Sequence, residues 1–471
     1  MIYVEGNKRT MEGSSPLEQA NELFYNRDLP QLYIETYGCQ MNVADTEIVV
    51  SIMQQNGYSI TGKMDEADVI LINTCSIREN AEKRIWGRLS VFKQLKRRNP
   101  NLLIGVIGCM AERLKKQIME KEKAADMVIG PDSYRDLPYL IQQAGAGQKV
   151  VNVLLSREET YAGISPVHTD RNRISAFITI MRGCNNMCSY CVVPYVRGSE
   201  RSRDPGSILD EARRLTRLGY REITLIGQNV DSYRWTGETG NGEFRFHNLL
   251  ESVAKTAPDT WIRFATSHPK DMSDEVFHTV SDFKNICRHI HLPVQSGSSR
   301  ILKLMNRGYT REWYMERIRT IKRILPDCSI TTDIIAGFCS ETEEDHRSTL
   351  SLMKWAEFDY SYMFKYSERP GTRAADRLKD DVPDEVKSRR LTEIIELQNS
   401  LSMKSKKRDV HNIYEVLVEG ISKKSDREFF GRTSQNKVAV FPKQGYNIGD
   451  RLTIEITSCT SATLIGKPVI S

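Results

Sequence analysis

Three cysteines lie within eight residues of one another near the middle of the chain, in the stretch Cys184-Asn185-Asn186-Met187-Cys188-Ser189-Tyr190-Cys191. Cysteine thiolates are soft ligands that favour iron-sulfur clusters, zinc or copper. A structural zinc site normally takes four protein ligands, and no nearby histidine or further cysteine supplies the fourth. Three thiolates on a four-iron cluster would leave one iron open to a small molecule. The spacing therefore favours an iron-sulfur site, with zinc or unligated loop cysteines as the alternatives.

Three further cysteines each follow an apolar run of strand length in the first part of the chain. The pairs are residues 32–37 with Cys39, residues 67–74 with Cys75, and residues 102–107 with Cys109. A helical stretch follows each pair, and alternating strand and helix predict a parallel sheet with right-handed crossovers. Ligands of such sheets bind beyond the carboxyl ends of the strands, so we expect all three cysteines at one edge. Three buried core cysteines are the alternative.

The close cysteines follow the first of six further strand candidates, which alternate with helical stretches. These strands are expected at residues 176–181, 222–226, 261–266, 289–294, 329–335 and 360–366. Six such units predict a partial parallel (β/α)6 barrel whose active edge lies at the carboxyl ends of its strands. A long helix is expected from about residue 384 to residue 407. Short alternating runs with glycines follow, and they predict a small antiparallel C-terminal β-barrel.

The 471 residues are about three times the length usual for one domain. We predict an α/β chain with a flexible lead-in at 1–30 and a doubly wound parallel-sheet domain at 31–160. The barrel core is expected at 170–405 and the small β-barrel at 406–471.

Ten cysteines occur in a chain without a secretory signal, which favours reduced thiols and a cytoplasmic location. No apolar run approaches the roughly 20 residues of a membrane span, so no membrane association is expected. The net charge of +6 is a mild bias toward polyanions. Basic runs at residues 93–98 and 404–408 fit either nucleic-acid contacts or solvated helix faces.

The CxxxCxxC spacing with Tyr190 before the last cysteine closely resembles the signature of the radical S-adenosylmethionine superfamily. The resemblance implies that Cys184, Cys188 and Cys191 hold a 4Fe-4S cluster whose open iron binds the methionine part of S-adenosylmethionine. It also implies that reduction of the bound S-adenosylmethionine yields a 5′-deoxyadenosyl radical that abstracts hydrogen.

Several other stretches together resemble the methylthiotransferase branch of that superfamily. They are Tyr37-Gly38-Cys39-Gln40-Met41-Asn42, Asn73-Thr74-Cys75, Gly108-Cys109, Cys191-Val192-Val193-Pro194-Tyr195-Val196-Arg197-Gly198 and Tyr366-Ser367-Glu368-Arg369-Pro370-Gly371-Thr372. The resemblance implies that Cys39, Cys75 and Cys109 hold a second, auxiliary 4Fe-4S cluster that carries the sulfur to be transferred. All six cysteines are thereby expected to act in catalysis.

The same resemblance places S-adenosylmethionine against polar residues that follow the barrel strands. The expected contacts are Tyr190, Gly227, Gln228, Asn229, Thr266, Ser267, Gln295, Ser296, Asp333 and Gly337. Each of the polar residues also fits a loop cap or a turn former. Buried inert thiols are expected at Cys287, Cys328, Cys339 and Cys459, and core histidines at His289 and His291.

The closing domain resembles a TRAM module, which binds RNA, and Lys423, Lys424, Arg427, Arg432 and Lys437 are candidates for phosphate contacts.

Two stretches of the methylthiotransferase motifs resemble the MiaB type, namely Tyr-Gly-Cys-Gln-Met-Asn and Val-Val-Pro-Tyr. This type adds a 2-methylthio group to N6-isopentenyladenosine beside the anticodon of tRNA. The alternatives are a methylthiotransferase of threonylcarbamoyladenosine in tRNA or of a ribosomal-protein aspartate, and a non-catalytic metal-containing RNA-binding protein. Expected partners are the tRNA anticodon loop and proteins that donate electrons and sulfur; the chain is expected to be a monomer.

Overall fold

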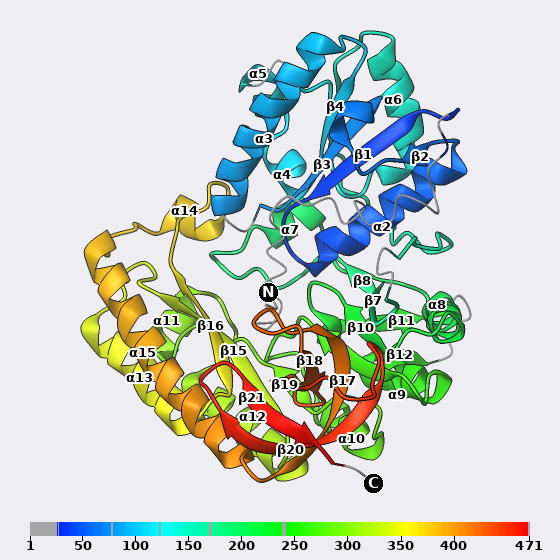
Figure 1. Cartoon of the computed structure of the whole chain (residues 1–471). Helices are drawn as coiled ribbons and strands as arrows, with labels where there is room; N and C mark the ends of the chain where they lie inside the picture. Colours follow the sequence, from blue (N-terminus) through cyan, green and yellow to red (C-terminus); the bar gives the residue numbers. More distant parts are fainter. Residues whose placement is uncertain are drawn as a thin grey trace.

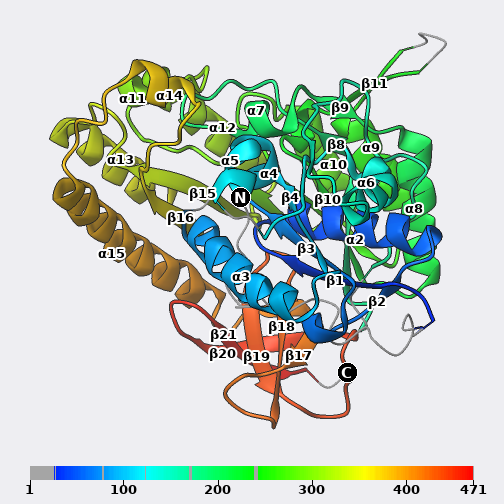
Figure 2. The same cartoon turned by 90° about the horizontal axis from the view of Figure 1, so that it is seen from above.

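The computed structural model describes residues 26, 28–76, 79–121, 124–168, 172–237 and 242–469. Most of the predicted lead-in, residues 1–30, lies outside them. Figure 1 shows an N-terminal sheet domain above a partial barrel; the C-terminal strands overlap the lower part of the barrel in this view, and Figure 2 shows them packed along one side of it. Within the described residues, no helix combines the length and the apolar character that a bilayer span requires.

The N-terminal domain is a six-stranded parallel sheet in the order β2-β1-β3-β4-β5-β6, so strand order reverses between β1 and β3. The prediction of a doubly wound sheet is therefore confirmed. Its strands are β1 Gln31–Thr36, β2 Ser59–Ile60, β3 Val69–Thr74, β4 Leu103–Gly108, β5 Met127–Ile129 and β6 Val150–Asn152. Its helices are α2 Gln40–Gln55, α3 Glu79–Arg98, α4 Cys109–Leu114, α5 Lys116–Lys121 and α6 Leu137–Gly145. The sequence did not predict β2, β5 or β6, because each has only two or three residues.

The central domain contains the six predicted strands, arranged as two parallel sheets in the orders β13-β10-β7 and β14-β15-β16. A bridge between Ile262 and Ile286 links the two sheets into one partial barrel. The strands are β7 Ser175–Thr179, β10 Glu222–Ile226, β13 Trp261–Ala265, β14 His289–His291, β15 Ser329–Ala336 and β16 Tyr360–Lys365. The covering helices are α8 Pro205–Arg217, α9 Phe246–Thr256, α10 Asp274–Asp282, α11 Ser299–Leu304, α12 Arg311–Ile324 and α13 Glu343–Ala356.

Helix α8 shows how the sequence encodes this outer layer. The Asp204 carboxylate accepts a hydrogen bond from Ser207 N at 2.7 Å, and Pro205 occupies the first turn, where its missing N–H is not needed. The residues it buries, Ile208, Ala212 and Leu215, recur at the spacing of one helix face. These three pack into the main core between the barrel strands and the helices.

The last strands close into a five-stranded barrel in the order β17-β18-β19-β21-β20. They are β17 Ile413–Ile421, β18 Glu428–Thr433, β19 Val438–Pro442, β20 Arg451–Cys459 and β21 Leu464–Pro468. The prediction of a small β-barrel is confirmed, except that β19 and β21 pair in parallel rather than antiparallel. Helix α15, Asp384–Asp409, leads to this barrel along the outer side of the central domain (Figure 2).

The C-terminal barrel packs against the amino ends of the central strands, opposite their carboxyl ends. Leu417 of β17 is buried with Trp261, the first residue of β13, and with Cys287 before β14. Arg432 of β18 donates to Glu222, the first residue of β10, at 2.7 Å. This contact leaves the carboxyl edge of the central strands free to face the N-terminal domain.

Candidate active site

Cys39, Cys75 and Cys109 lie at the carboxyl edge of the N-terminal sheet, as the sequence predicts. Cys39 precedes α2 after strand β1, Cys75 follows strand β3 directly, and Cys109 is the first residue of α4 after β4. Strand order reverses between β1 and β3, and such a reversal opens a crevice at this edge of a parallel sheet. The three thiols therefore occupy the position where this class of fold binds its ligands.

Two asparagines from the cysteine motifs hold the ends of β1 and β3 together. The Asn42 side-chain amide donates to Asn73 Oδ1 at 3.0 Å and to the Thr74 carbonyl at 3.2 Å. In return, Asn73 Nδ2 donates to the Asn42 carbonyl at 2.9 Å. Both side chains are fully buried, where an amide without partners would be costly. The pair thus positions Cys39 next to Cys75.

Gly38 is required by this close approach. Its φ of +142° lies in a region that L side chains rarely adopt, and a Cβ there would be 2.5 Å from Cys75 Cβ and from Asn42 Oδ1. Any larger residue would force the β1 end away from the β3 end.

The surroundings of Cys39 and Cys109 shift the pKa values of these two thiols in opposite directions. A hydrogen bond from the Cys75 thiol, supported by the charge of Arg197, outweighs burial and lowers the pKa of Cys39 to about 6. Burial raises the pKa of Cys109 even though the Arg197 guanidinium opposes the shift. Thiols this close to one another can act together as ligands of a soft metal.

Cys184, Cys188 and Cys191 lie in the loop between β8, Met181–Arg182, and α7, Val193–Arg197. The neighbouring Ser189 anchors this loop to the end of α11, because its backbone N–H donates to the Met305 carbonyl at 2.9 Å and its hydroxyl donates to the Leu304 carbonyl at 2.8 Å.

A second anchor joins the loop to the central strands. Asn186 Nδ2 and Asn229 Nδ2 both donate to Asp271 Oδ2, at 2.8 and 2.7 Å. The loop is thus held on both sides at the barrel's carboxyl edge.

The second set of thiols is also largely desolvated. Burial and the nearby Cys188 raise the pKa of Cys191 to about 12, and burial raises the pKa of Cys184 as well. Arg307 Nη1 donates to Cys188 Sγ at 3.3 Å, and His268 Nε2 lies 4.0 Å from the same sulfur. Arg307 therefore places a cationic donor at this sulfur, whereas burial lowers the pKa of His268 and keeps its ring neutral.

The two cysteine sets face each other across the domain interface. Cys109 packs with Val192, which follows Cys191 directly in the chain, and with Val196 of α7. Cys39 packs with Met41, Ala44 and Ile226, the last residue of strand β10. Two carboxyl edges, one from each domain, therefore meet at one place.

Buried polar atoms without hydrogen-bond partners gather at the central carboxyl edge. Among the described residues they include Gln228 Oε1, Asn229 Oδ1 and Asp231 Oδ1. Asp231 is a residue that the sequence analysis missed, and burial raises the pKa of its carboxyl to about 8. Such atoms are rare in folded proteins and indicate a site for a polar ligand.

The other residues expected to contact S-adenosylmethionine lie at different places relative to the carboxyl edge of the central strands. Gly227 and Thr266 directly follow strands β10 and β13, and Ser267 is buried next to Thr266. Gln295 lies at a φ of +74° beside β15. Ser296 points away into the core, where its hydroxyl lies 3.4 Å from Thr349 Oγ1 and accepts from Ser298 N at 3.2 Å.

Asp333 and Tyr190 belong to side-chain networks of their own. Asp333 Oδ1 lies 3.4 Å from His291 Nε2, while His291 Nδ1 and His289 Nε2 both contact the Thr331 hydroxyl at 3.0 Å. Both histidines are buried, as expected of core residues, but His291 Nε2 has no hydrogen-bond partner in the described structure. The Tyr190 ring packs edge-on against Phe338, and its hydroxyl accepts from Arg307 at 3.4 Å.

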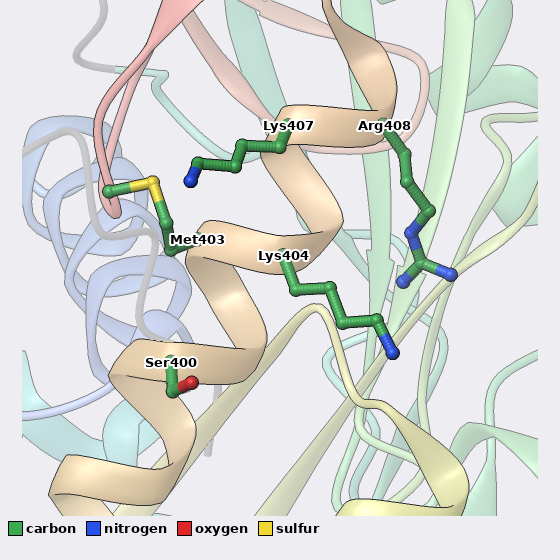
Figure 3. Close-up of a pocket in the computed structure, with 5 residues that line it drawn as sticks. All are labelled: Ser400, Met403, Lys404, Lys407 and Arg408. Carbon is green, nitrogen blue, oxygen red and sulfur yellow. The ribbon is translucent and has the colours of Figure 1, made fainter.

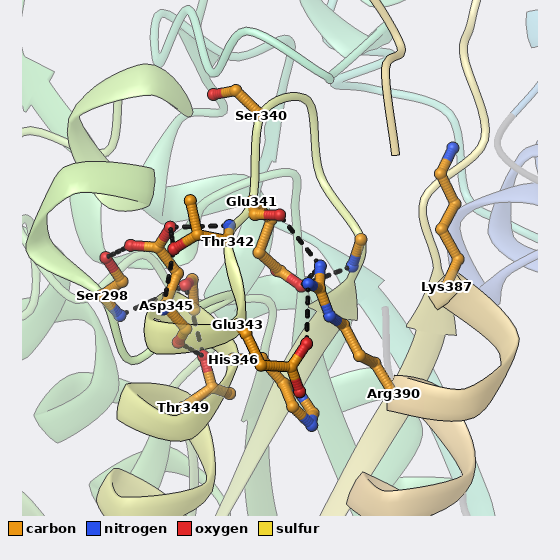
Figure 4. A network of polar contacts seen from close by, with 12 residues as sticks. Ser298, Ser340, Glu341, Thr342, Glu343, Asp345, His346, Thr349, Lys387 and Arg390 are labelled. Carbon is orange, nitrogen blue, oxygen red and sulfur yellow. Dashed lines mark hydrogen bonds and ion pairs between the residues drawn. The ribbon is translucent and has the colours of Figure 1, made fainter. Parts of the chain in front are cut away.

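The loop after Gly337 is held by helix α15 (Figure 4). Gly337 N donates to Glu341 Oε1 at 3.0 Å, and Arg390 of α15 donates to the same oxygen and to the Glu341 carbonyl at 3.0 Å. Burial raises the pKa of the Glu341 carboxyl to about 7. The loop that ends strand β15 is therefore fixed from the outside of the barrel.

Both cysteine sets have the donor chemistry of iron-sulfur sites. In the part of the chain that the structure describes, no three Cys, His, Asp or Glu side chains converge on the position of a single metal ion. A four-iron cluster takes its thiolates at separate corners of a cube, so it needs ligands that stand farther apart than those of one ion. Soft, buried thiols on two opposed loops fit such groups.

Three family models match successive parts of the chain. The first, described as an uncharacterized protein family, UPF0004, matches residues 31–130. The radical SAM superfamily matches residues 178–353, and the TRAM domain matches residues 407–469.

Curated relatives match almost the whole chain. A tRNA-2-methylthio-N(6)-dimethylallyladenosine synthase of Amoebophilus asiaticus is 57% identical over 446 residues, covering 93% of this chain and 92% of the relative. A protein of the same name from Phocaeicola vulgatus is 56% identical and covers 93% of this chain and 96% of its own.

Solved structures show the same fold at low sequence identity. The radical S-adenosylmethionine methyltransferase TsrM from Kitasatospora setae aligns with a TM-score of 0.56 and 14% identity, covering 73% of this chain and 74% of its own. The cobalamin-dependent radical enzyme OxsB aligns with a TM-score of 0.52 and 13% identity, covering 83% of this chain and 61% of its own.

Proposed function

Because the chain belongs to the family of tRNA-2-methylthio-N(6)-dimethylallyladenosine synthases, we propose that its two cysteine sets form one active site for that reaction. The chain is a radical S-adenosylmethionine methylthiotransferase that acts on tRNA and uses S-adenosylmethionine and 4Fe-4S clusters. The base it modifies is N6-isopentenyladenosine next to the anticodon, and the group it adds is 2-methylthio. The observation that carries this proposal is the packing of Cys109 against Val192, which joins the two sets.

In this proposal each cysteine set holds one 4Fe-4S cluster. Cys184, Cys188 and Cys191 hold the cluster that binds S-adenosylmethionine, and Cys39, Cys75 and Cys109 hold the auxiliary cluster. Bound S-adenosylmethionine supplies a methyl group and the means to abstract a hydrogen atom from an inert C–H bond. The protein's residues bind these groups, orient them and exclude water from between them.

The partnerless polar atoms at the barrel edge support a cofactor site there. Gln228 and Asn229 follow β10, and both have a buried side-chain oxygen without a partner in the described structure. Carbonyl oxygens of this kind accept hydrogen bonds from an amino group or from ribose hydroxyls. We assign them, with Tyr190, Gly227, Thr266, Ser267, Gln295, Asp333 and Gly337, to the surroundings of S-adenosylmethionine.

The RNA interface cannot use all of the basic residues that the sequence suggested. Arg432 is buried and pairs with Glu222 and Glu419, and Lys437 pairs with Asp409 at 2.8 Å. The prediction that these two contact phosphates is therefore wrong, because carboxylates inside the protein already neutralise them. Lys424 and Arg427 are exposed in the same barrel and remain as candidates.

A second basic surface lies at the carboxyl end of α15, next to the C-terminal barrel. Ser400, Met403, Lys404, Lys407 and Arg408 line a hollow of about 490 Å³. Figure 3 shows Lys404 and Arg408 pointing to one side, where both pair with Glu357, and Lys407 pointing to the other. Three cations against one carboxylate leave an excess of positive charge, so we assign this surface to the RNA backbone.

Iron content tests the two-cluster proposal. The anaerobically reconstituted parent should hold about eight irons, and the variant Cys39→Ala, Cys75→Ala, Cys109→Ala about four. Cys287→Ala is the matched control, since this buried cysteine lies in a separate cluster with Trp261 and Leu417, and it should keep the parent's iron. Equal iron in the parent and the triple variant would contradict the proposal.

Acceptor specificity tests the substrate. With S-adenosylmethionine, reductant and sulfide, the parent should methylthiolate tRNA that carries N6-isopentenyladenosine, and should leave tRNA that lacks the isopentenyl group and ribosomal proteins unmodified. If the parent methylthiolated a ribosomal protein instead, the chain would belong with the methylthiotransferases that modify a ribosomal-protein aspartate. Proteins that donate electrons and sulfur, a monomeric state and a cytoplasmic location remain predictions.

A further inference from the structure

Arg197 of α7 makes a direct contact with one of the auxiliary cysteines. Its Nε donates to Cys109 Sγ at 3.0 Å, and the arginine side chain is only 2% exposed. Arg197 follows the other cysteine set by six residues, so it reaches from one set to the other. Its Nη1 is buried without a hydrogen-bond partner in the described structure, which leaves a donor for an anionic neighbour.

A single buried carboxylate holds this arginine in place. Asp45 of α2 contacts Arg197 Nη2 at 2.7 Å through one oxygen and Arg182 Nη1 at 2.9 Å through the other. The Asp45 side chain is fully buried. Arg182 precedes the loop of Cys184 and Arg197 ends the helix after it, while Asp45 lies on the helix that begins after Cys39. Asp45 therefore ties both ends of one cysteine loop to the helix of the other set.

A positive charge and an N–H donor at a ligand sulfur both favour the reduced form of an iron-sulfur cluster. Reduction adds one negative charge, which a nearby guanidinium stabilises, and burial keeps solvent from screening that interaction. A negative charge at the position of Asp45 acts in the opposite direction. The two residues should therefore shift the reduction potential with opposite signs.

We propose that Arg197 is a positioning residue that raises the reduction potential of the auxiliary cluster through its contact with Cys109, and that Asp45 sets the strength of this effect. The proposal rests on the assignment of Cys39, Cys75 and Cys109 as cluster ligands. It gives the interface between the two domains an electrostatic role in addition to bringing the two cysteine sets together.

The test uses the full chain with Cys184, Cys188 and Cys191 changed to alanine, so that only the auxiliary cluster is present. Its midpoint potential is measured by a titration followed with electron paramagnetic resonance. Arg197→Met should shift the midpoint to a more negative value, and Arg197→Lys, which keeps the charge, should shift it less. Asp45→Asn should shift it to a more positive value.

Arg203→Met is the matched control. Arg203 is also a buried arginine and pairs with Glu211 at 2.5 Å, but its hydrogen-bond partners in the described structure include no sulfur, and neither Asp45 nor Arg197 is among them. Its loss should leave the midpoint unchanged. An unchanged midpoint in Arg197→Met with iron retained, or an equal shift in Arg203→Met, overturns the proposal.

Loss of iron from one of these variants would also test the proposal. If Arg197→Met loses its iron, Asp45→Asn decides alone, and an unchanged or more negative midpoint there overturns the proposal. If the starting variant holds no iron where about four are expected, the ligand assignment fails first and the proposed role of Arg197 falls with it.

Discussion

Arg432 of the C-terminal barrel and Glu222 at the start of strand β10 form a buried ion pair, with Arg432 Nη2 at 2.7 Å from Glu222 Oε1. Arg263 Nε donates to the other Glu222 oxygen at 2.6 Å, and its terminal nitrogens donate to the Thr433 and Ser434 carbonyls. One carboxylate thereby joins two arginines from two domains. The contact fixes the C-terminal barrel at the end of the central domain that is opposite the cysteines.

Replacing Arg432 should therefore destabilise the protein rather than only weaken RNA binding. Arg432→Met leaves the Glu222 and Glu419 carboxylates buried with less compensating charge, which costs about 3–5 kcal/mol when one partner of a buried pair is removed. Thermal unfolding should show an earlier transition. Arg427→Ala changes an exposed arginine of the same barrel and should leave that transition in place while it lowers the affinity for tRNA.

The same pair predicts how stability depends on pH. Burial opposes ionisation of Glu222, but Arg263 and Arg432 outweigh it and lower the pKa of Glu222 to about 2. Above the ordinary glutamate pKa the ionised pair stabilises the fold fully, and this contribution is lost as the pH falls toward 2. Between pH 5 and pH 3 the unfolding temperature of the apoprotein should fall more steeply for the parent than for Glu222→Gln. An equally steep fall of the unfolding temperature in the parent and in Glu222→Gln would contradict the conclusion that ionised Glu222 stabilises the fold.

The asparagine pair at the auxiliary site should control iron binding. Asn73→Ala removes one acceptor of Asn42 Nδ2 and the donor to the Asn42 carbonyl, so the ends of β1 and β3 keep only the bond from Asn42 to the Thr74 carbonyl. We expect faster loss of iron to a chelator from the auxiliary site, measured in the variant that lacks Cys184, Cys188 and Cys191. Asn56→Ala, at the far end of α2, is the control and should match the parent.

Gly337 should be intolerant of a side chain. Its φ is +71°, and a Cβ would lie 2.3 Å from Cγ of Lys387 on α15. Backbone strain of order 1–3 kcal/mol should displace the loop after β15. Binding of S-adenosylmethionine to the reconstituted Gly337→Ala variant, measured by calorimetry, should be about tenfold weaker than to the parent, the equivalent of about 1.4 kcal/mol.

Gly87→Ala is the control for that measurement. Gly87 lies in helix α3 with no positive φ, and a Cβ added there would meet nothing within 4 Å. Alanine should stabilise the helix by up to about 1 kcal/mol and leave the cofactor affinity unchanged. A similar loss of affinity in both variants would show that the effect is not specific to the β15 loop.

The basic end of α15 should contribute to RNA binding through charge. Lys407→Ala removes an exposed cation of the hollow that Ser400, Met403 and Lys404 also line. It should weaken tRNA binding at low salt and reduce the slope of the affinity against salt concentration by up to about one unit. Arg389→Ala, near the other end of α15, removes a cation paired with Glu343 and Glu393 and should change the slope little. Equal slopes for the parent and Lys407→Ala would exclude this surface.

Much of the architecture could be predicted because it depends on short-range patterns. The runs of apolar residues before Cys39, Cys75 and Cys109, and before the loop of Cys184, are long enough to specify strands. Alternation of strands with helices then determines a parallel sheet, and a parallel sheet places all of its strand ends on one edge. The resemblance of the motifs added the identity of the cofactors.

The tertiary structure alone decided which charges are available and how the two edges meet. Arg427 and Arg432 look equivalent in the sequence, yet only Arg432 lies opposite a buried carboxylate, one that is 210 residues away. Asp45 and Arg197 carry no local signal of their contact, because an ion pair depends on how whole domains dock. Strands β2, β5 and β6 are too short to have a sequence period, and they form because a neighbouring strand offers hydrogen bonds. Local spacing therefore determined the elements and their cysteines, whereas long-range packing determined the electrostatics of the site.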